Sequence, residues 1–193
     1  MHHLTFDQDL SSKEFSEKLN LLVKKGINFN QKSKLGNTAA HIVANRCTFH
    51  RTNISHFPLF VGLAKQNKFD FNSKGEEGLT VLQIASSLQY KNYRFFDPIS
   101  NVQTLIEAVA NLDLDCTSAS GATAFFYAIQ ACRVDEAMIL LNAGADPLCY
   151  GNKESNPLTL IESYLADNRY GAIHVELFEL KQMIIDMRTR LFR

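Results

Sequence analysis

The sequence predicts an all-α fold, a solenoid of helix-turn-helix repeats joined by hairpin loops. Three observations carry this prediction. One short motif recurs three times without internal gaps, a second motif precedes each copy at a constant distance, and residues that cap helices stand at matching places in each copy. Sequence that repeats in this way is typical of folds in which each unit packs only on its neighbours.

The first motif begins with glycine and carries threonine two residues later. Its three complete copies, GNTAAHIVA, GLTVLQIAS and GATAFFYAI, occupy 36–44, 78–86 and 121–129. A fourth copy at 154–161 keeps a Pro-Leu pair but lacks the glycine and the threonine. We expect this degraded copy to be the terminal repeat, because the terminal units of repeat proteins depart from the common pattern.

The second motif, GINFN in its first copy, ends six residues before the first motif begins. Its four copies occupy 26–30, 68–72, 111–115 and 144–148. Two independent motifs in constant phase make coincidence very unlikely, so the pair of motifs defines one structural unit.

Helix-capping residues support this division into units. The threonine of the first motif is well placed to accept a hydrogen bond from the backbone at the start of a helix. Gly26 and Gly144 each follow an apolar helical run, where a residue with positive φ commonly ends a helix. Ser11 and Glu14 have the spacing of a capping box, which predicts a single N-terminal helix before the first complete unit.

Both motifs resemble those of the ankyrin repeat, G-x-T-P-L-H-x-A-A and G-A-D-V-N. The resemblance extends from about residue 15 to the C-terminal helix. It implies one ankyrin-repeat domain over 1–193. Its expected parts are an N-terminal cap helix (1–30), three repeats (34–72, 76–115 and 119–148), and a degenerate repeat with a long C-terminal capping helix (152–193).

Two units are longer than the ankyrin period of about 33 residues. Thr38 and Thr80 are 42 residues apart and Thr80 and Thr123 are 43 apart, whereas the equivalent position of the next unit follows after 33. The extra residues are expected to enlarge the loop between the first and second helix of their units, at 47–56 and 89–101.

Aromatic and basic side chains alternate in these enlarged loops, as in FHR at 49–51 and YKNYR at 90–94. Tyr and Arg dominate the energetics of many protein interfaces, so one interpretation is a partner-binding surface. A second is that the aromatic side chains fold inward, or that the extra residues lengthen the helices. A third is a site for single-stranded nucleic acid, whose bases stack on aromatic rings, but the neutral charge of the chain favours it least.

The last segment carries apolar residues at alternating spacings of four and three, which predicts a helix of about 30 Å. These residues are Ile173, Leu177, Leu180, Ile184, Met187 and Leu191. Phe178 and Ile185 widen the apolar face. We expect this helix to cap the last repeat, and the alternative is that part of its face docks a partner or a second copy of the chain.

Composition argues against several classes of partner. Twenty basic residues balance twenty acidic ones, so no overall field attracts the chain to nucleic acid or to an anionic membrane. The four cysteines form no C-x-x-C pair, and no leader peptide or membrane-spanning stretch is evident. The expectation is a soluble protein of a reducing, cytoplasmic compartment.

No constellation of residues predicts a cofactor, a metal or a catalytic centre. His41 stands at the histidine of the ankyrin signature, where the family uses the imidazole to hydrogen-bond backbone across repeats. Cys47, His50 and His56 are of metal-ligand type, but their spacing fits no zinc site. We therefore expect a protein that is not an enzyme, and the alternative is an enzyme with an unrecognised site between the enlarged loops.

The resemblance implies a protein-protein interaction module that binds through its concave face, together with the enlarged loops. The expected contact residues are Lys34, Asn37, Asn45, Arg46, Glu76 and Glu77 on the concave face, and Phe49, Arg51, Tyr90, Tyr93 and Arg94 in the loops. The irregular insertions and the richness in Asn, Lys, Phe and Ile resemble the ankyrin effectors that intracellular bacterial pathogens secrete into the host cell cytosol. Such a chain binds a host protein, and the alternative is a housekeeping scaffold in the cytoplasm of its own cell.

Overall fold

The computed structural model describes residues 11–47, 56–87, 100–150 and 156–191, and all regular secondary structure in these ranges is helical. The fold of this part of the chain is therefore all-α, as the sequence predicts. The α-helices are α1 (Ser12–Lys24), α2 (Ala39–Cys47), α3 (His56–Gln66), α4 (Val81–Ser87), α5 (Asn101–Ala108), α6 (Ala124–Gln130), α7 (Val134–Asn142), α8 (Pro157–Leu165) and α9 (His174–Leu191). Short 3-10 helices are η1 (Glu76–Gly78) and η3 (Asn168–Ile173).

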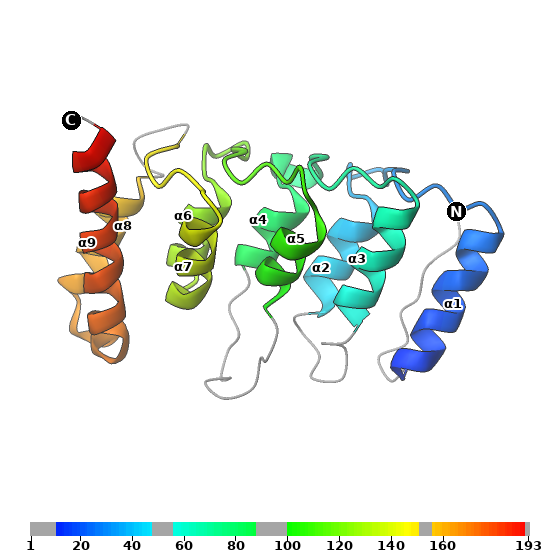
Figure 1. Ribbon diagram of the computed structural model, residues 1–193, viewed down its shortest axis with the longest axis horizontal. Helices are drawn as coiled ribbons and strands as arrows, with labels where there is room; N and C mark the ends of the chain where they lie inside the picture. The colour runs from blue at the N-terminus through cyan, green and yellow to red at the C-terminus, as the bar shows by residue number, and fades with distance from the viewer. Residues whose placement is uncertain (1–10, 48–55, 88–99, 151–155, 192–193) are drawn as a thin grey trace.

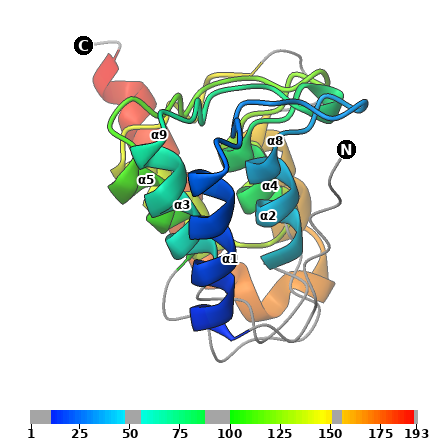
Figure 2. The same cartoon turned by 90° about the vertical axis from the view of Figure 1, so that its right-hand side faces the viewer.

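The helices form two adjacent rows (Figures 1 and 2). The even row contains α2, α4, α6 and α8, and the odd row contains α1, α3, α5, α7 and α9, with each helix packed on the next of its row. Contacts between the rows join the pairs α2/α3, α4/α5, α6/α7 and α8/α9. α1 precedes the first of these pairs in the odd row.

α1 begins at the capping box that the sequence predicts. The Glu14 N–H donates to Ser11 Oγ at 3.3 Å, and the Ser11 N–H donates to Glu14 Oε2 at 2.9 Å. Phe15 and Leu19 are buried, and α1 packs on α3. Gly26 follows the helix with a φ of +70°, the left-handed conformation expected at a helix end.

The glycine motif forms the same turn in three consecutive units. In each unit a backbone N–H donates to the carbonyl oxygen four residues later, at 2.8 to 2.9 Å. The three donors are Ser33, Gly75 and Ser118. The motif glycine of each turn has a φ between +68° and +82°, which only glycine adopts without strain. These glycines are Gly36, Gly78 and Gly121.

The residue that follows each turn begins an even-row helix. Thr123 Oγ1 accepts a hydrogen bond from the Phe126 N–H at 3.3 Å. In the degraded copy Asn156 takes this place, and its Oδ1 accepts the Leu158 N–H at 3.0 Å. Pro157 occupies the first turn of α8, where its missing N–H costs no hydrogen bond. The fourth copy therefore begins a helix without the threonine.

Side chains of the second motif bond each connecting segment to the next. Asn30 accepts the Asp70 N–H at 3.0 Å and donates to the Lys68 carbonyl at 3.3 Å. Asn72 makes the same two bonds one unit later, at 2.9 and 2.7 Å. Asp115 makes the accepting bond at 2.8 Å, but a carboxylate has no N–H with which to make the donating one.

The core lies between the two rows. Small side chains line the even row, which lets its helices approach one another closely. They are Ala40, Ala44, Ala85, Ala124 and Ala128, all at most 1% exposed. Large apolar side chains such as Phe57, Phe60, Leu105 and Leu140 fill the odd-row side. Each buried side chain of this size stabilises the fold by about 1.5–3 kcal/mol.

α9 is the last helix of the odd row. Leu177, Leu180 and Ile184 are fully buried, and α9 packs on both α7 and α8. The predicted apolar stripe is confirmed for these residues, while the side chain of Leu191 lies outside the described part. Phe178, on the flank of the stripe, remains 62% exposed. No helix in the described ranges is both long enough and apolar enough to cross a membrane.

The connections within the helix pairs differ in length. Three residues, 131–133, join α6 to α7, whereas 48–55 separate α2 from α3 and 88–100 separate α4 from α5. The extra residues of the first two units therefore lie between the two helices of a pair, where the spacing predicts them. The loops 48–55 and 88–99 themselves lie outside the described residues, so their role as a contact surface stays a prediction.

Asp115→Asn is expected to stabilise the chain by about 1 kcal/mol at neutral pH, because the amide supplies the donor that Asn30 and Asn72 use. Burial raises the pKa of the Asp115 carboxyl above its ordinary 3.8. The stability that Asp115 contributes is therefore present in acid and is lost as the pH rises through the folded pKa. Urea unfolding of both proteins near pH 7 and pH 4 should show the larger gain near pH 7. A variant less stable than the native chain near pH 7 contradicts this account.

Candidate protein-binding surface

The segments that connect one helix pair to the next extend to one side of the two rows. Each ends in its glycine-motif turn, here called a tip, beside the even row. Figure 2 shows these segments stacked above the helices and extending past α2 and α4. The tips carry exposed side chains of unlike chemistry. They are Lys34, Leu35, Glu76, Glu77, Ala119 and Ser120. We call these residues, with Asn37, the tip surface.

Neighbouring tips are hydrogen-bonded to each other. Asn37 Nδ2 donates to Glu76 Oε2 at 3.1 Å, and the Glu76 N–H donates to Asn37 Oδ1 at 3.0 Å. One unit later the Ala119 N–H donates to the Glu77 carbonyl at 2.9 Å. Glu77 has a φ of +56°, which is uncommon for a residue other than glycine and requires support from its surroundings. The tips therefore hold a defined geometry relative to one another.

Gly75 makes the close approach of the first two tips possible. A Cβ atom at this position would lie less than 3.0 Å from Asn37 Oδ1 and from the imidazole ring of His41. A Cβ atom essentially never makes contacts this short, so with any larger residue at position 75 the Asn37 or His41 side chain would have to shift. The equivalent residues of the other two turns, Ser33 and Ser118, carry side chains, so this approach is particular to the first pair of tips.

Two lysine side chains cross between connecting segments. Lys32 Nζ donates to the Lys74 carbonyl at 2.8 Å, and Lys74 Nζ donates to the Thr117 carbonyl at 2.7 Å. Each ammonium group therefore adds a second bond between segments that the Asn30 and Asn72 side chains already join. These lysines contribute to the rigidity of the frame that carries the tips.

His41 and Gln83 make equivalent contacts in successive units. His41 Nε2 donates to the Leu79 carbonyl at 3.0 Å, and its Nδ1 accepts from Thr38 Oγ1 at 2.7 Å. Gln83 Nε2 donates to the Ala122 carbonyl at 3.0 Å, and its Oε1 accepts the N–H of the capping threonine at 2.8 Å. The structural role predicted for His41 is confirmed, and the amide of Gln83 fills the same role one unit later.

The burial of His41 decides its protonation state. The side chain is 1% exposed, and burial lowers its pKa. A carbonyl oxygen only accepts hydrogen bonds, so Nε2 carries the proton of the neutral ring and Nδ1 is left to accept. A second proton on Nδ1 would face the Thr38 N–H, which lies 3.3 Å away. The side chain of His41 is therefore the neutral imidazole in the folded chain.

The structure places the predicted contact residues in two groups. Lys34, Asn37, Glu76 and Glu77 lie together at the first two tips. Asn45 is exposed on α2, and the backbone of Arg46 continues that helix. The five loop residues lie outside the described part of the chain. They are Phe49, Arg51, Tyr90, Tyr93 and Arg94.

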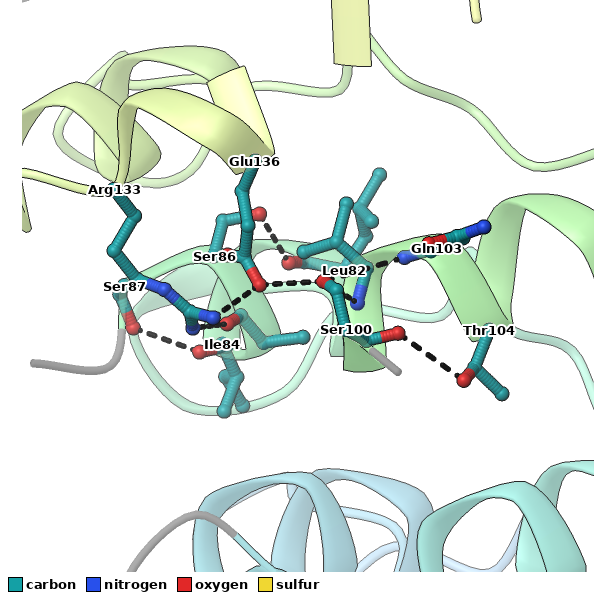
Figure 3. Close-up of polar contacts among 11 residues, drawn as sticks. Leu82, Ile84, Ser86, Ser87, Ser100, Gln103, Thr104, Arg133 and Glu136 are labelled. Carbon is teal, nitrogen blue, oxygen red and sulfur yellow. Dashed lines mark hydrogen bonds and ion pairs between the residues drawn. The ribbon is translucent and has the colours of Figure 1, made fainter. Parts of the chain in front are cut away.

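A buried ion pair lies where the enlarged loop between α4 and α5 begins and ends (Figure 3). Arg133 forms a salt bridge with Glu136 of α7 and donates to the Ala85 carbonyl of α4 at 3.5 Å. Glu136 is 2% exposed, and its Oε1 also accepts from Ser100 Oγ at 2.5 Å. Ser100 is the N-cap residue of α5, so one carboxylate joins the beginning of α5 to α7.

In the last turn of α4, beside this ion pair, two serine side chains bond to backbone carbonyls of their own helix. Ser86 Oγ donates to the Leu82 carbonyl and Ser87 Oγ donates to the Ile84 carbonyl, each at 2.9 Å (Figure 3). Both ends of the enlarged loop therefore start from backbone that is bonded within its own helix and held against α7.

Sequence reasoning missed both this ion pair and the close approach at Gly75. Arg133 and Glu136 are three residues apart on one helical turn, which is the signal in the sequence that could have drawn attention to them. Their burial depends on helices that meet only after the units stack. Gly75 lies before the first motif and belongs to neither pattern.

Other ionisable groups of the described chain make packing contacts. Burial raises the pKa of the Cys132 and Cys149 thiols, and it raises that of Tyr164 to about 12. The Tyr164 hydroxyl donates to the Gln130 carbonyl at 3.2 Å. No group of three or more His, Cys, Asp or Glu side chains within the described ranges is placed to hold a metal ion.

No protein-family model and no curated protein matches the chain. The geometry of the tip surface and of the helix rows is therefore the basis on which a function can be argued.

His41→Gln is expected to remove a loss of stability in mild acid, because Gln83 makes the equivalent contacts without titrating. The folded pKa of His41 lies below its ordinary 6.5, so the unfolded chain takes up the proton first as the pH falls. The stability contributed by His41 is thus full above that value and is lost as the pH falls below it. Denaturant unfolding between about pH 8 and pH 5 should show a shallower decline for the variant, and two parallel curves would contradict the prediction.

Arg133→Ala is expected to lower the free energy of unfolding by about 3–5 kcal/mol, because it leaves the buried Glu136 carboxylate without its cation. Arg133→Met combined with Glu136→Leu removes both charges and should recover most of the loss. Arg169→Ala is the matched control, since its ion pair with Asp167 lies at the surface, where solvent screens it, and should contribute little to stability. Equal losses from Arg133→Ala and Arg169→Ala in urea unfolding would show that the burial of Glu136 does not matter.

Proposed function

We propose that the chain is an ankyrin-repeat solenoid that binds another protein through its tip surface. The observation that carries this proposal is that three successive turns repeat one hydrogen-bonded geometry while the residues exposed on them differ. A constant frame with changing side chains suits recognition, because the backbone positions every contact.

The agreement between the motifs and the contacts supports the ankyrin assignment. The motif glycine adopts a positive φ, the residue two positions later begins an even-row helix, and His41 bonds the next unit. The second motif bonds consecutive connecting segments through Asn30, Asn72 and Asp115. Each position that defines the resemblance thus has a physical task in the stack.

The chemistry of the tip surface favours a protein partner. Leu35 is 63% exposed and is adjacent to Lys34, while Glu76 and Glu77 stand exposed on the next tip. An apolar anchor beside charges of both signs suits a protein or peptide that presents an apolar side chain with complementary charges. The two glutamates would repel the phosphate groups of a nucleic acid.

We place binding and no catalytic role at this surface, and we propose that the enlarged loops extend it. If the chain is an effector, its partner is a host-cell protein; if it is a scaffold, its partner belongs to the cell that makes the chain. Capture from lysates of the two cell types, followed by identification of the bound proteins, separates these alternatives. A small-molecule reaction catalysed by the purified chain would favour the enzyme alternative.

Leu35→Ser combined with Glu76→Lys is expected to weaken binding of a captured partner at least tenfold, about 1.4 kcal/mol, because it removes the apolar anchor and reverses a charge. Calorimetric titration with the purified partner measures the change. Both residues are exposed, and Glu76→Lys removes only the exposed hydrogen bond from Asn37 Nδ2, so the variant should lose no more than about 1.5 kcal/mol of stability in urea unfolding.

The matched control is Leu59→Ser combined with Glu107→Lys, the same substitutions on exposed residues of the odd row. This control should bind the partner as the native chain does. If the control weakens binding and the tip variant does not, the partner binds the odd row and the assignment of the tip surface is wrong.

A further inference from the structure

The exposed large apolar side chains of the described chain gather at the two ends of the stack. Five lie between α1 and α3, namely Leu21, Ile27, Leu35, Ile42 and Leu59. Two lie on α9, namely Val175 and Phe178. None of the large apolar side chains described from α4 to α8 reaches the same exposure. Helices in the middle of the stack bury their apolar faces against neighbouring helices, whereas the helices at the two ends leave apolar side chains exposed.

α1 and α9 are the end helices of the odd row (Figure 1). α1 packs on α3 and α9 packs on α7, whereas α3, α5 and α7 each lie between two neighbours of the row. On α1, Leu21 is 53% exposed on the side turned away from the buried Phe15 and Leu19. On α9, Val175 is 69% exposed and Phe178 is 62% exposed. Each end helix therefore presents the kind of face that the interior helices bury against a neighbour.

The apolar face of α1 is surrounded by basic side chains. Lys18, Lys24 and Lys25 lie one helical turn from Leu21, together with the single acid Glu17. All four charged residues are exposed. This end of the stack therefore has an excess of positive charge.

The apolar face of α9 is bordered by acidic side chains. Glu176 and Glu179 lie beside Val175 and Phe178 and are exposed. Lys181, also near Phe178, is paired at 2.9 Å with Glu162 of α8, which reduces its effect. The part of α9 around Val175 and Phe178 is thus apolar and negative, the complement of α1, and the exposed Arg188 lies further along the helix.

The same polarity runs along the whole chain. Residues 1–78 contain eleven Lys and Arg against seven Asp and Glu, and residues 79–193 contain nine against thirteen. The positive excess of the first part of one molecule is therefore attracted to the net negative remainder of another.

We propose that the chain associates head to tail with a second copy of itself, the exposed face of α9 of one molecule packing on the exposed face of α1 of the next. The odd row then continues from molecule to molecule. A symmetric contact of α9 with α9 would place Glu176 and Glu179 against their own copies, and a symmetric contact of α1 would oppose lysines. A head-to-tail contact that does not close into a ring grows into a linear chain.

Sedimentation equilibrium of the full chain tests the proposal. The average mass should rise above the 21.8 kDa of the monomer as concentration increases, and it should fall back when salt screens the charges. Phe178→Ser alters the exposed face of α9 (the tail), and Leu21→Ser alters the exposed face of α1 (the head). Each should raise the dissociation constant for self-association at least tenfold. Leu35→Ser is the control, because it removes a leucine that is 63% exposed, against 53% for Leu21, from the tip surface and not from α1, and should associate as the native chain does.

A mixture of the Phe178→Ser and Leu21→Ser variants distinguishes this arrangement from a symmetric one. The intact α1 of the Phe178→Ser chain should bind the intact α9 of the Leu21→Ser chain, so that the mixture forms dimers and nothing longer. The proposal is overturned if the native chain is monomeric up to its solubility limit, if either variant alone associates like the native chain, or if the mixture stays monomeric.

Discussion

The stack depends on the hydrogen bonds that the second motif makes to the backbone of the next connecting segment. Asn30, Asn72 and Asp115 each accept a backbone N–H from the following unit, and the two asparagines also donate to a carbonyl. These bonds fix how consecutive connecting segments lie against each other, and the segments in turn carry the helices of the two rows. Because the partners are backbone groups, side chains on the tips can change without altering the frame.

Local features of the fold could be predicted from the sequence because their causes lie within a few residues. The capping box at Ser11, the positive φ of Gly26 and the start of a helix at Asn156 each depend on short-range geometry that a motif records. His41 could also be interpreted correctly, since the resemblance of its motif implies that the imidazole bonds the backbone of the next unit. The same reasoning predicted the buried stripe of α9, because helical spacing determines which side chains share a face.

Features that depend on contact between distant units could not be predicted in this way. The burial of Glu136 requires α4, α5 and α7 to meet, and the need for glycine at position 75 arises from Asn37 and His41 of the preceding unit. The exposure of Phe178 depends on where the packing of α7 and α8 on α9 ends. For the candidate site, the sequence predicted Lys34, Asn37, Glu76 and Glu77 as contact residues, but it did not show that Asn37 and Glu76 bond each other.

Two consecutive joints of the stack, the contacts between one helix pair and the next, differ in their response to pH. His41 bonds Leu79 at the first joint and can take up a proton, whereas Gln83 bonds Ala122 at the second and does not titrate. In a linear array each unit is held only by its neighbours, so weakening one joint loosens the units on its two sides and leaves the others packed. A proton on His41 acts on the joint between the first two helix pairs, while the amide of Gln83 holds the following joint unchanged. Protonation of His41 in acid therefore weakens the contact between the α2/α3 and α4/α5 pairs, and the next contact along the stack does not respond in this way.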